Sequence, residues 1–107
     1  MARKLQTFDE FQVEYFRERP EEIESYIEMI FEEYGKDADT GALLSALRVI
    51  AQAKGIRNLS SETGLTRQGI QLALSDKGNP RLDNINAIMH SLGFRLKAEK
   101  IETAQTH

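Results

Sequence analysis

The stretch LSSETGLTRQGIQLAL, residues 59–74, predicts two short helices joined by a tight turn. Gly64 stands where the chain must corner, and glycine adopts the left-handed backbone conformation that a Cβ disfavours. Thr66 is placed to cap the second helix, and Ile70 and Leu74 follow four residues apart, on one buried face of it. This spacing is typical of a helix-turn-helix, a motif that places its second helix in the major groove of DNA.

The composition predicts one cytoplasmic domain without a membrane partner. The chain has 107 residues, about the size of one ordinary domain, and 40% of them are hydrophobic, which is enough for a modest core. Cysteine is absent, which excludes disulfides and thiolate metal sites and fits a reducing cytoplasm. The sequence contains no apolar run long enough for a signal peptide or a membrane span.

The net charge of −3 is distributed unevenly along the chain. Residues 1–40 carry twelve acidic and five basic side chains, a net charge of −7, whereas residues 41–107 carry nine basic and five acidic side chains, a net charge of +4. A basic segment therefore follows an acidic one. This asymmetry suits a protein that contacts DNA with one end and a cationic partner with the other.

The acidic part, residues 1–39, is expected to form an arm of two helices. Thr7 and Glu10 have the spacing of a capping box, which predicts a helix that begins directly after the threonine. Pro20 ends this segment and is a good first residue for the next one. Apolar residues then recur at helical spacing and predict a second helix that ends near Gly35 and has a glutamate-rich outer face.

Residues 36–41 are expected to link this arm to a DNA-binding domain at residues 40–101. Four helices are expected in that domain. The first is amphipathic and is stopped by Gly55, the next two are the helix pair, and the last is capped by Asp83.

The end of the chain has the periodicity of a strand. Phe94, Leu96 and Ala98 alternate with charged residues, as in a half-buried β-strand, and residues 102–107 form a tail. A lone strand needs a partner, so pairing with a second copy or with a bound protein is expected. The predicted fold class is therefore all-α, with a two-helix N-terminal arm and a short C-terminal β-strand.

Motifs along the basic domain resemble the addiction-module antidote proteins, which are HigA-like antitoxins with an XRE-type helix-turn-helix. The segments that carry the resemblance are residues 44–48, 51–55, 59–67, 73–80 and 92–96. The most discriminating of them contains Gly78, Asn79 and Pro80 directly after the helix pair. The resemblance implies a lambda-repressor-like domain in a homodimeric antitoxin. Such a protein neutralises a RelE/ParE-like toxin encoded beside it and represses its own operon.

Candidate DNA contacts lie on the second helix of the pair, which in this motif enters the groove by its N-terminal end. The side chains most able to meet base edges are Thr66, Arg67, Gln68 and Gln71. Arginine can bond guanine and glutamine can bond adenine, each pair giving roughly 1–3 kcal/mol of discrimination. Phosphate contacts are expected from Asn58, Lys77 and Arg81, and two further cations, Lys54 and Arg57, lie at nearby helix ends. The alternative is that all are solvated surface residues, with Asn58 as a helix cap.

The glutamate-rich helix of the arm is the candidate toxin-binding surface. A toxin that cleaves RNA must be cationic to hold its substrate, and this helix offers the complementary charge together with apolar anchors. The candidate contacts are Glu24, Tyr26, Glu28 and Phe31. The alternative is a solvated back face whose aromatic residues belong to the core.

Two further functions remain open, because Gly69 and Leu72 stand where the family has a polar and a basic residue. One is a free-standing XRE-type repressor with no toxin partner, and the other is a protein-binding inhibitor that has lost DNA binding. His90 and His107 lack paired ligand spacing, and the sequence shows neither a nucleophile–base pair nor a phosphate loop. No catalysis, metal or cofactor is therefore expected.

Overall fold

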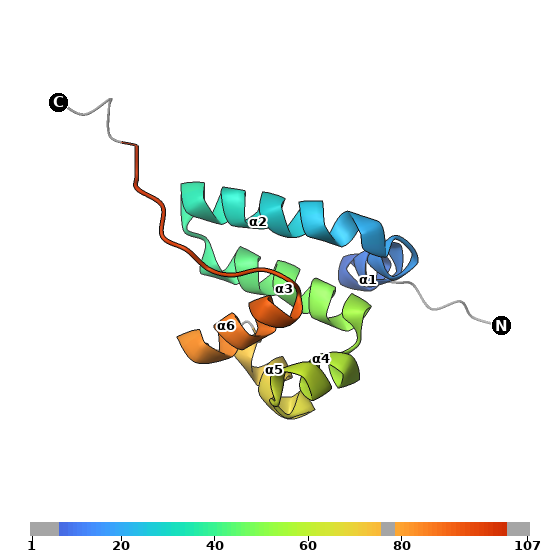
Figure 1. Cartoon of the computed structure of the whole chain (residues 1–107). Helices are drawn as coiled ribbons and strands as arrows, with labels where there is room; N and C mark the ends of the chain where they lie inside the picture. The colour runs from blue at the N-terminus through green and yellow to red at the C-terminus, as the bar shows by residue number, and fades with distance from the viewer. Residues whose placement is uncertain (1–6, 76–78, 103–107) are drawn as a thin grey trace.

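The structure, a computed structural model, describes residues 7–75 and 79–102. Over these residues every regular element is a helix, which confirms the predicted all-α class for this part of the chain (Figure 1). The N-terminal elements are α1 (Phe8–Glu18), the short 3-10 helix η1 (Pro20–Glu22) and α2 (Ile23–Asp37). The elements that follow are α3 (Thr40–Lys54), α4 (Ile56–Thr63), α5 (Arg67–Ala73) and α6 (Leu82–Ser91).

Local sequence determines both ends of α1. The hydroxyl of Thr7 accepts a hydrogen bond from the amide of Glu10 at 3.0 Å, and the Glu10 carboxylate accepts one from the amide of Thr7 at 2.9 Å. This confirms the predicted capping box, which satisfies two amides that a helix start leaves unpaired. At the other end, Pro20 has no amide hydrogen to continue α1, and it becomes the first residue of η1 instead.

Helix α2 continues past its predicted end at Gly35. Ala38 takes the left-handed conformation with a φ of 54° and ends the helix there, whereas Gly35 has no positive φ. A glycine weakens a helix by about 1 kcal/mol, but it ends one only where the backbone turns left-handed. Asp39 then caps α3 by accepting a hydrogen bond from the amide of Ala42 at 3.0 Å. The predicted linker at residues 36–41 is therefore wrong, because all but two of its residues are helical.

Helix α3 lies at the centre of the fold, between α2 on one side and the group of α4, α5 and α6 on the other (Figure 1). Its Leu47 and Ile50 are 1% and 0% exposed. The other helices contribute Phe16, Ile27, Leu59, Ile70, Ile88 and Met89 to the same core. One core is thus shared by the acidic arm and the basic part of the chain.

The corner between α4 and α5 is made by Gly64, which has the predicted left-handed backbone with a φ of 80°. Two side chains hold this corner. The hydroxyl of Ser60 donates a hydrogen bond to the carbonyl of Leu65, and the hydroxyl of Thr63 accepts one from the amide of Leu65 at 3.1 Å. The turn is therefore fixed by its own side chains as well as by the glycine.

Helix α5 is held at both ends. Thr66 caps it as predicted, accepting a hydrogen bond from the amide of Gly69 at 2.9 Å. Ile70 and Leu74 are buried, as their spacing predicted. At the C-terminal end, Arg48 of α3 donates a hydrogen bond to the carbonyl of Leu74. The outward side of α5 therefore has a fixed orientation relative to α3.

Helix α6 is not capped as predicted. It begins at Leu82, so that Asp83 lies in its first turn and Arg81 stands at the capping position. The Asp83 carboxylate accepts hydrogen bonds from Arg81 instead of capping the helix. Residues 76–78, which precede α6 in the sequence, lie outside the described residues.

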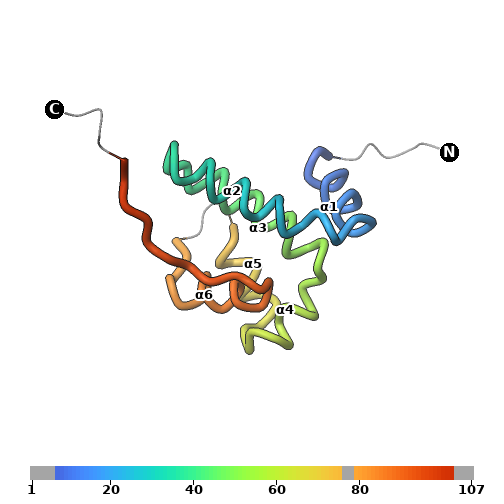
Figure 2. Tube along the Cα trace, turned by 45° about the horizontal axis from the view of Figure 1, so that its top comes forward, coloured from blue at the N-terminus to red at the C-terminus, as the bar shows by residue number. Residues whose placement is uncertain are grey.

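The predicted C-terminal strand is not seen in the described part of the single chain. After Gly93, which has a φ of 89°, the chain runs extended from α6 toward the end of α2 (Figures 1 and 2). The amide of Phe94 donates to the carbonyl of Met89 at 2.9 Å, and Phe94 and Leu96 pack against the core. A strand requires a hydrogen-bonded neighbour, and residues 7–75 and 79–102 contain no second strand that could provide one. The alternating pattern instead reflects an extended segment that turns apolar side chains toward helices.

We predict opposite effects for alanine at two glycines. Gly64→Ala lowers the free energy of unfolding by about 1–2 kcal/mol, because an L-residue is strained in the left-handed conformation. Gly35→Ala, inside α2, raises the free energy of unfolding by about 0.5–1 kcal/mol through helix propensity. A Cβ at either position meets nothing within 4 Å, so steric clashes do not obscure the comparison. The free energies of unfolding of both variants can be measured by urea titration monitored by circular dichroism. Changes of the same sign in the two variants would contradict the assignment of a left-handed backbone to Gly64 and a helical backbone to Gly35.

Candidate functional site

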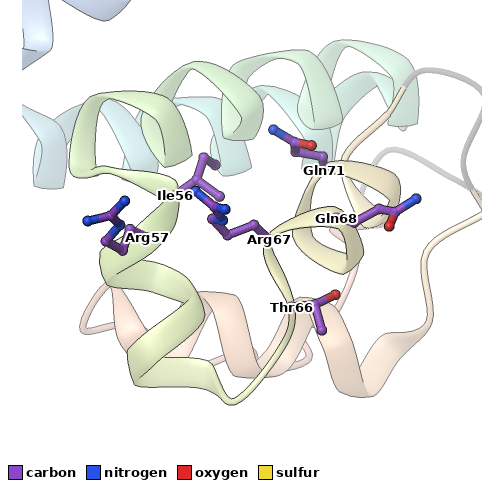
Figure 3. Close-up of a pocket in the computed structure, with 6 residues that line it drawn as sticks. All are labelled: Ile56, Arg57, Thr66, Arg67, Gln68 and Gln71. Atoms are coloured by element: carbon purple, nitrogen blue, oxygen red, sulfur yellow. The ribbon is translucent and has the colours of Figure 1, made fainter.

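The outward side of α5 and the first turn of α4 enclose an open hollow of about 650 Å³ (Figure 3). The residues that line it are Ile56, Arg57, Thr66, Arg67, Gln68 and Gln71. Four of these six are the side chains that the sequence predicted to meet DNA base edges. The structure therefore brings this predicted set together at one surface.

The local fold explains why these side chains gather. Arg67 and Gln68 occupy the first turn of α5, directly after its cap. Gln71 follows Arg67 by four residues, so the two side chains lie on the same face of the helix, one turn apart. Figure 3 shows the guanidinium of Arg67 directed toward Ile56 at the start of α4. Within the described residues, the side chains of Arg67, Gln68 and Gln71 have no hydrogen-bond partner. They are therefore available to an external ligand.

Arg57 belongs to this hollow, although the sequence suggested no more than a cation at a nearby helix end. Its position depends on Gly55, whose φ of 98° turns the chain so that α4 begins one residue later. The lining therefore holds two guanidinium groups, from Arg57 and Arg67, and no carboxylate. Such a surface can bind phosphates through its arginines and base edges through its glutamines.

Gly69 and Leu72 modify this face in different ways. A Cβ on Gly69 would lie 3.0 Å from the hydroxyl oxygen of Thr66, so an alanine there would crowd the group that caps α5. The glycine thus leaves room for the cap. Leu72 is not among the residues that line the hollow, but it is 68% exposed on the same helix, directly after Gln71, and it places an apolar side chain beside the polar residues of α5.

Asn58, the first of the predicted phosphate contacts, is not among the residues that line the hollow. Asn58 is the third residue of α4, and its amide donates to the carbonyl of Lys54 at 3.2 Å. The expected capping of α4 by Asn58 is wrong, because α4 begins at Ile56 and the side chain instead closes the end of α3. Lys77 lies outside the described residues.

Arg81, the third predicted phosphate contact, is already paired. Its guanidinium donates to both carboxylate oxygens of Asp83, each at 3.1 Å. These hydrogen bonds hold the pKa of Asp83 below its ordinary value, and they raise the pKa of Arg81. An anion that binds Arg81 must therefore compete with Asp83.

The four predicted toxin contacts do not form one patch. Glu24, Glu28 and Phe31 follow one another by four and three residues, so they share one flank of α2. Tyr26 lies on the opposite flank, where it stacks on Phe16 with 4.6 Å between ring centroids. There it also lines a groove of about 190 Å³ between α2 and α3. Both glutamates are exposed, whereas the two aromatic residues are half-buried against the core.

Three polar contacts hold the acidic arm in place, two within the arm and one to α3. The hydroxyl of Tyr15 donates to Glu22 at 2.7 Å, and this hydrogen bond raises the pKa of Tyr15. The guanidinium of Arg19 lies 4.3 Å from the centre of the Tyr15 ring, a cation–π distance. Arg17 donates to the carbonyl of Gln52 in α3 at 3.1 Å. The arm is therefore an ordered part of the fold.

Two other classes of site have no support in the described residues. No group of three or more histidine, cysteine, aspartate or glutamate side chains is placed there to hold a metal ion. None of the described helices is long and apolar enough to cross a membrane.

Comparison with known proteins covers almost the whole chain. Residues 5–100 match the model of a family described as "Probable addiction module antidote protein". An uncharacterized protein of Haemophilus influenzae is 29% identical over 100 residues, which cover 94% of this chain and 96% of that protein. No solved structure matches the chain. The family match includes the acidic arm as well as the helices that form the hollow.

We predict that Arg81→Gln raises the pKa of Asp83 toward its ordinary value, because the variant loses the guanidinium that stabilises the carboxylate. The lowered pKa of Asp83 also contributes to the stability of the fold. This contribution to the free energy of unfolding is present when the pH is above the pKa of Asp83 in the unfolded chain, and it is lost as the pH falls through the pKa of Asp83 in the folded chain. NMR titration of the Asp83 carboxyl carbon measures the shift, with Arg95→Gln as a control that removes an exposed arginine elsewhere. An unchanged Asp83 pKa in Arg81→Gln would contradict the pairing.

Proposed function

The chain belongs to the family of probable addiction module antidote proteins, and on this premise we propose that it is the antitoxin of a type II toxin–antitoxin module. It neutralises a RelE/ParE-like toxin encoded beside it and binds operator DNA as a transcriptional autorepressor. The observation that carries the proposal is that the family match spans both the acidic arm and the hollow on α5. Both of its partners, operator DNA and the toxin, place it in the cytoplasm.

In the DNA-binding half of the proposal, α4 and α5 are the helix-turn-helix of a lambda-repressor-like domain. Helix α5 is then the recognition helix, and it enters the major groove by the end that carries Arg67 and Gln68. Arg67 can bond O6 and N7 of guanine, and Gln68 or Gln71 can bond N6 and N7 of adenine. Arg57, at the start of α4, is placed to contact a flanking phosphate.

Charge supports this orientation. The hollow holds two arginines and no acidic side chain, and residues 41–107 carry a net charge of +4. DNA binding through such a surface weakens as the salt concentration rises. In a plot of the logarithm of the binding constant against the logarithm of the salt concentration, each neutralised phosphate contributes about −0.9 to the slope. As a homodimer, the protein would hold two recognition helices about 34–36 Å apart, one turn of the DNA helix, over a palindromic operator.

In the toxin-binding half, the acidic arm supplies the surface. A toxin that cleaves RNA needs a cationic site for the phosphates of its substrate, so it presents a positive patch to its antitoxin. Glu24 and Glu28 are exposed on one flank of α2, beside the half-buried Phe31. Complementary charges of this kind accelerate association and select the partner.

One observation favours a second candidate function. Leu72 is 68% exposed on α5, where a basic side chain would strengthen DNA binding. A protein-binding inhibitor that no longer contacts DNA would tolerate this residue. Binding to promoter DNA separates the two candidates, because this inhibitor neutralises the toxin but does not bind its own promoter.

We predict that Arg67→Ala weakens binding to a fragment of the chain's own promoter by about tenfold or more, the loss expected for a bidentate base contact. Fluorescence anisotropy over a range of salt concentrations measures the affinity. Lys36→Ala is the matched control, because it removes an exposed cation from α2 rather than from the hollow. A wild-type chain that leaves the promoter unbound at low salt would support the protein-binding inhibitor instead.

We also predict that Glu24→Lys combined with Glu28→Lys slows association with the toxin several-fold, most strongly at low salt, because exposed interface charges act mainly on the association rate. Surface plasmon resonance with the purified toxin measures the rate. The control is Glu62→Lys combined with Glu99→Lys, two exposed glutamates outside the arm. Equal association rates for the two double variants would argue against a role of the arm in toxin binding.

A further inference from the structure

Two phenylalanines project from the outer side of α1 and are left uncovered by the described part of the chain. Phe8 is 73% exposed and Phe11 is 56% exposed. Tyr15 follows Phe8 by seven residues, so the three rings form one aromatic stripe along α1 (Phe8, Phe11 and Tyr15), in which Tyr15 is half-buried and the two phenylalanines are exposed. The inner side of the helix is already filled by Val13 and Phe16, which are 7% and 5% exposed. Single exposed apolar residues are ordinary on protein surfaces, but an aligned group of aromatic rings marks an interaction site.

The aromatic stripe is presented on a helix that is fixed at both ends. The capping box of Thr7 and Glu10 sets the first turn, directly beside Phe8. Near the other end, the Arg17 side chain donates to the carbonyl of Gln52 in α3. Figures 1 and 2 both show α1 on the side of the molecule opposite the far end of the extended segment that follows α6. A partner can therefore bind the stripe without the loss of conformational entropy that ordering the helix would cause.

Charge selects the kind of partner. Glu14 and Glu18 follow Phe11 by three and seven residues, so they lie one and two turns further along the same outer side of α1, and both are exposed. The helix holds four acidic residues and one arginine, and that arginine is bonded to α3. Such a surface repels DNA phosphates, and it repels a second copy of itself for the same reason. It attracts a protein that carries basic residues around an apolar pocket.

We propose that the aromatic stripe of α1 is the anchor for the toxin, with Phe8 and Phe11 inserted into an apolar pocket rimmed by lysine and arginine side chains. This inference rests on the proposed antitoxin function and assigns the anchoring role to α1. Glu24 and Glu28 of α2 then accelerate the encounter, whereas the two phenylalanines determine how long the complex lasts. Buried aromatic anchors surrounded by charged residues are the usual arrangement of binding energy in protein interfaces.

The test compares alanine variants of the full chain in binding to the purified toxin encoded beside it. Phe8→Ala combined with Phe11→Ala is expected to weaken the dissociation constant by about tenfold or more, chiefly through faster dissociation. Alanine keeps helix propensity high, and both side chains are exposed, so the fold is retained. Met29→Ala is the matched control, because Met29 is also an exposed apolar residue of the arm, at 49%, but lies beside the groove between α2 and α3.

The outcomes separate this inference from the function on which it rests. A wild-type chain that does not bind the toxin overturns both. Toxin binding that survives the double variant unchanged, or that is lost in Met29→Ala alone, overturns the role of the stripe and leaves the antitoxin function standing. A double variant that changes oligomeric state in light scattering but keeps its toxin affinity shows that a second copy covers the stripe, and also overturns the inference. If the double variant is unfolded, Phe11→Ala alone, away from the capping box, provides the same test.

Discussion

The burial of α3 is the constraint on which the rest of the structure depends. Leu47 and Ile50 are almost fully buried in this helix, against which α1, α2 and α4 all pack. Two hydrogen bonds outside the apolar core also fix the positions of neighbouring helices relative to α3. Arg17 of α1 donates to a backbone carbonyl near the end of α3, and Arg48 of α3 donates to a backbone carbonyl at the end of α5. The acidic arm and the face of α5 are therefore two surfaces supported by one helix, and their relative positions are fixed by it.

Features set by a few neighbouring residues could be predicted from the sequence. The capping box at Thr7, the corner at Gly64 and the cap at Thr66 each depend on chemistry within about one helical turn. The candidate DNA contacts on α5 share this property, because cap and helical spacing together determine that Arg67, Gln68 and Gln71 lie close to one another. For this reason the predicted set on α5 assembled as one surface.

Features that depend on how the helices pack could not be predicted. Arg57 lines the hollow because α4 begins directly after Gly55 and packs against α5. Tyr26 is separated from the glutamates of α2 because the core selects which flank each residue occupies, and an apolar stripe alone does not. The alternation after Gly93 has the periodicity of a strand, but the neighbour that would make it a strand is a tertiary property. Apolar residues two apart can turn toward helices just as well as toward a sheet.

The link between α2 and α3 consists of Ala38 and Asp39, both exposed. Exposed connections are where proteases cut most readily. A cut there would leave α1 and α2 held to α3 by noncovalent contacts alone, so the apolar side of α3 that they cover would face water whenever they separate. The arm and the face of α5 thus share one support, so cleavage at this single link would loosen both surfaces together.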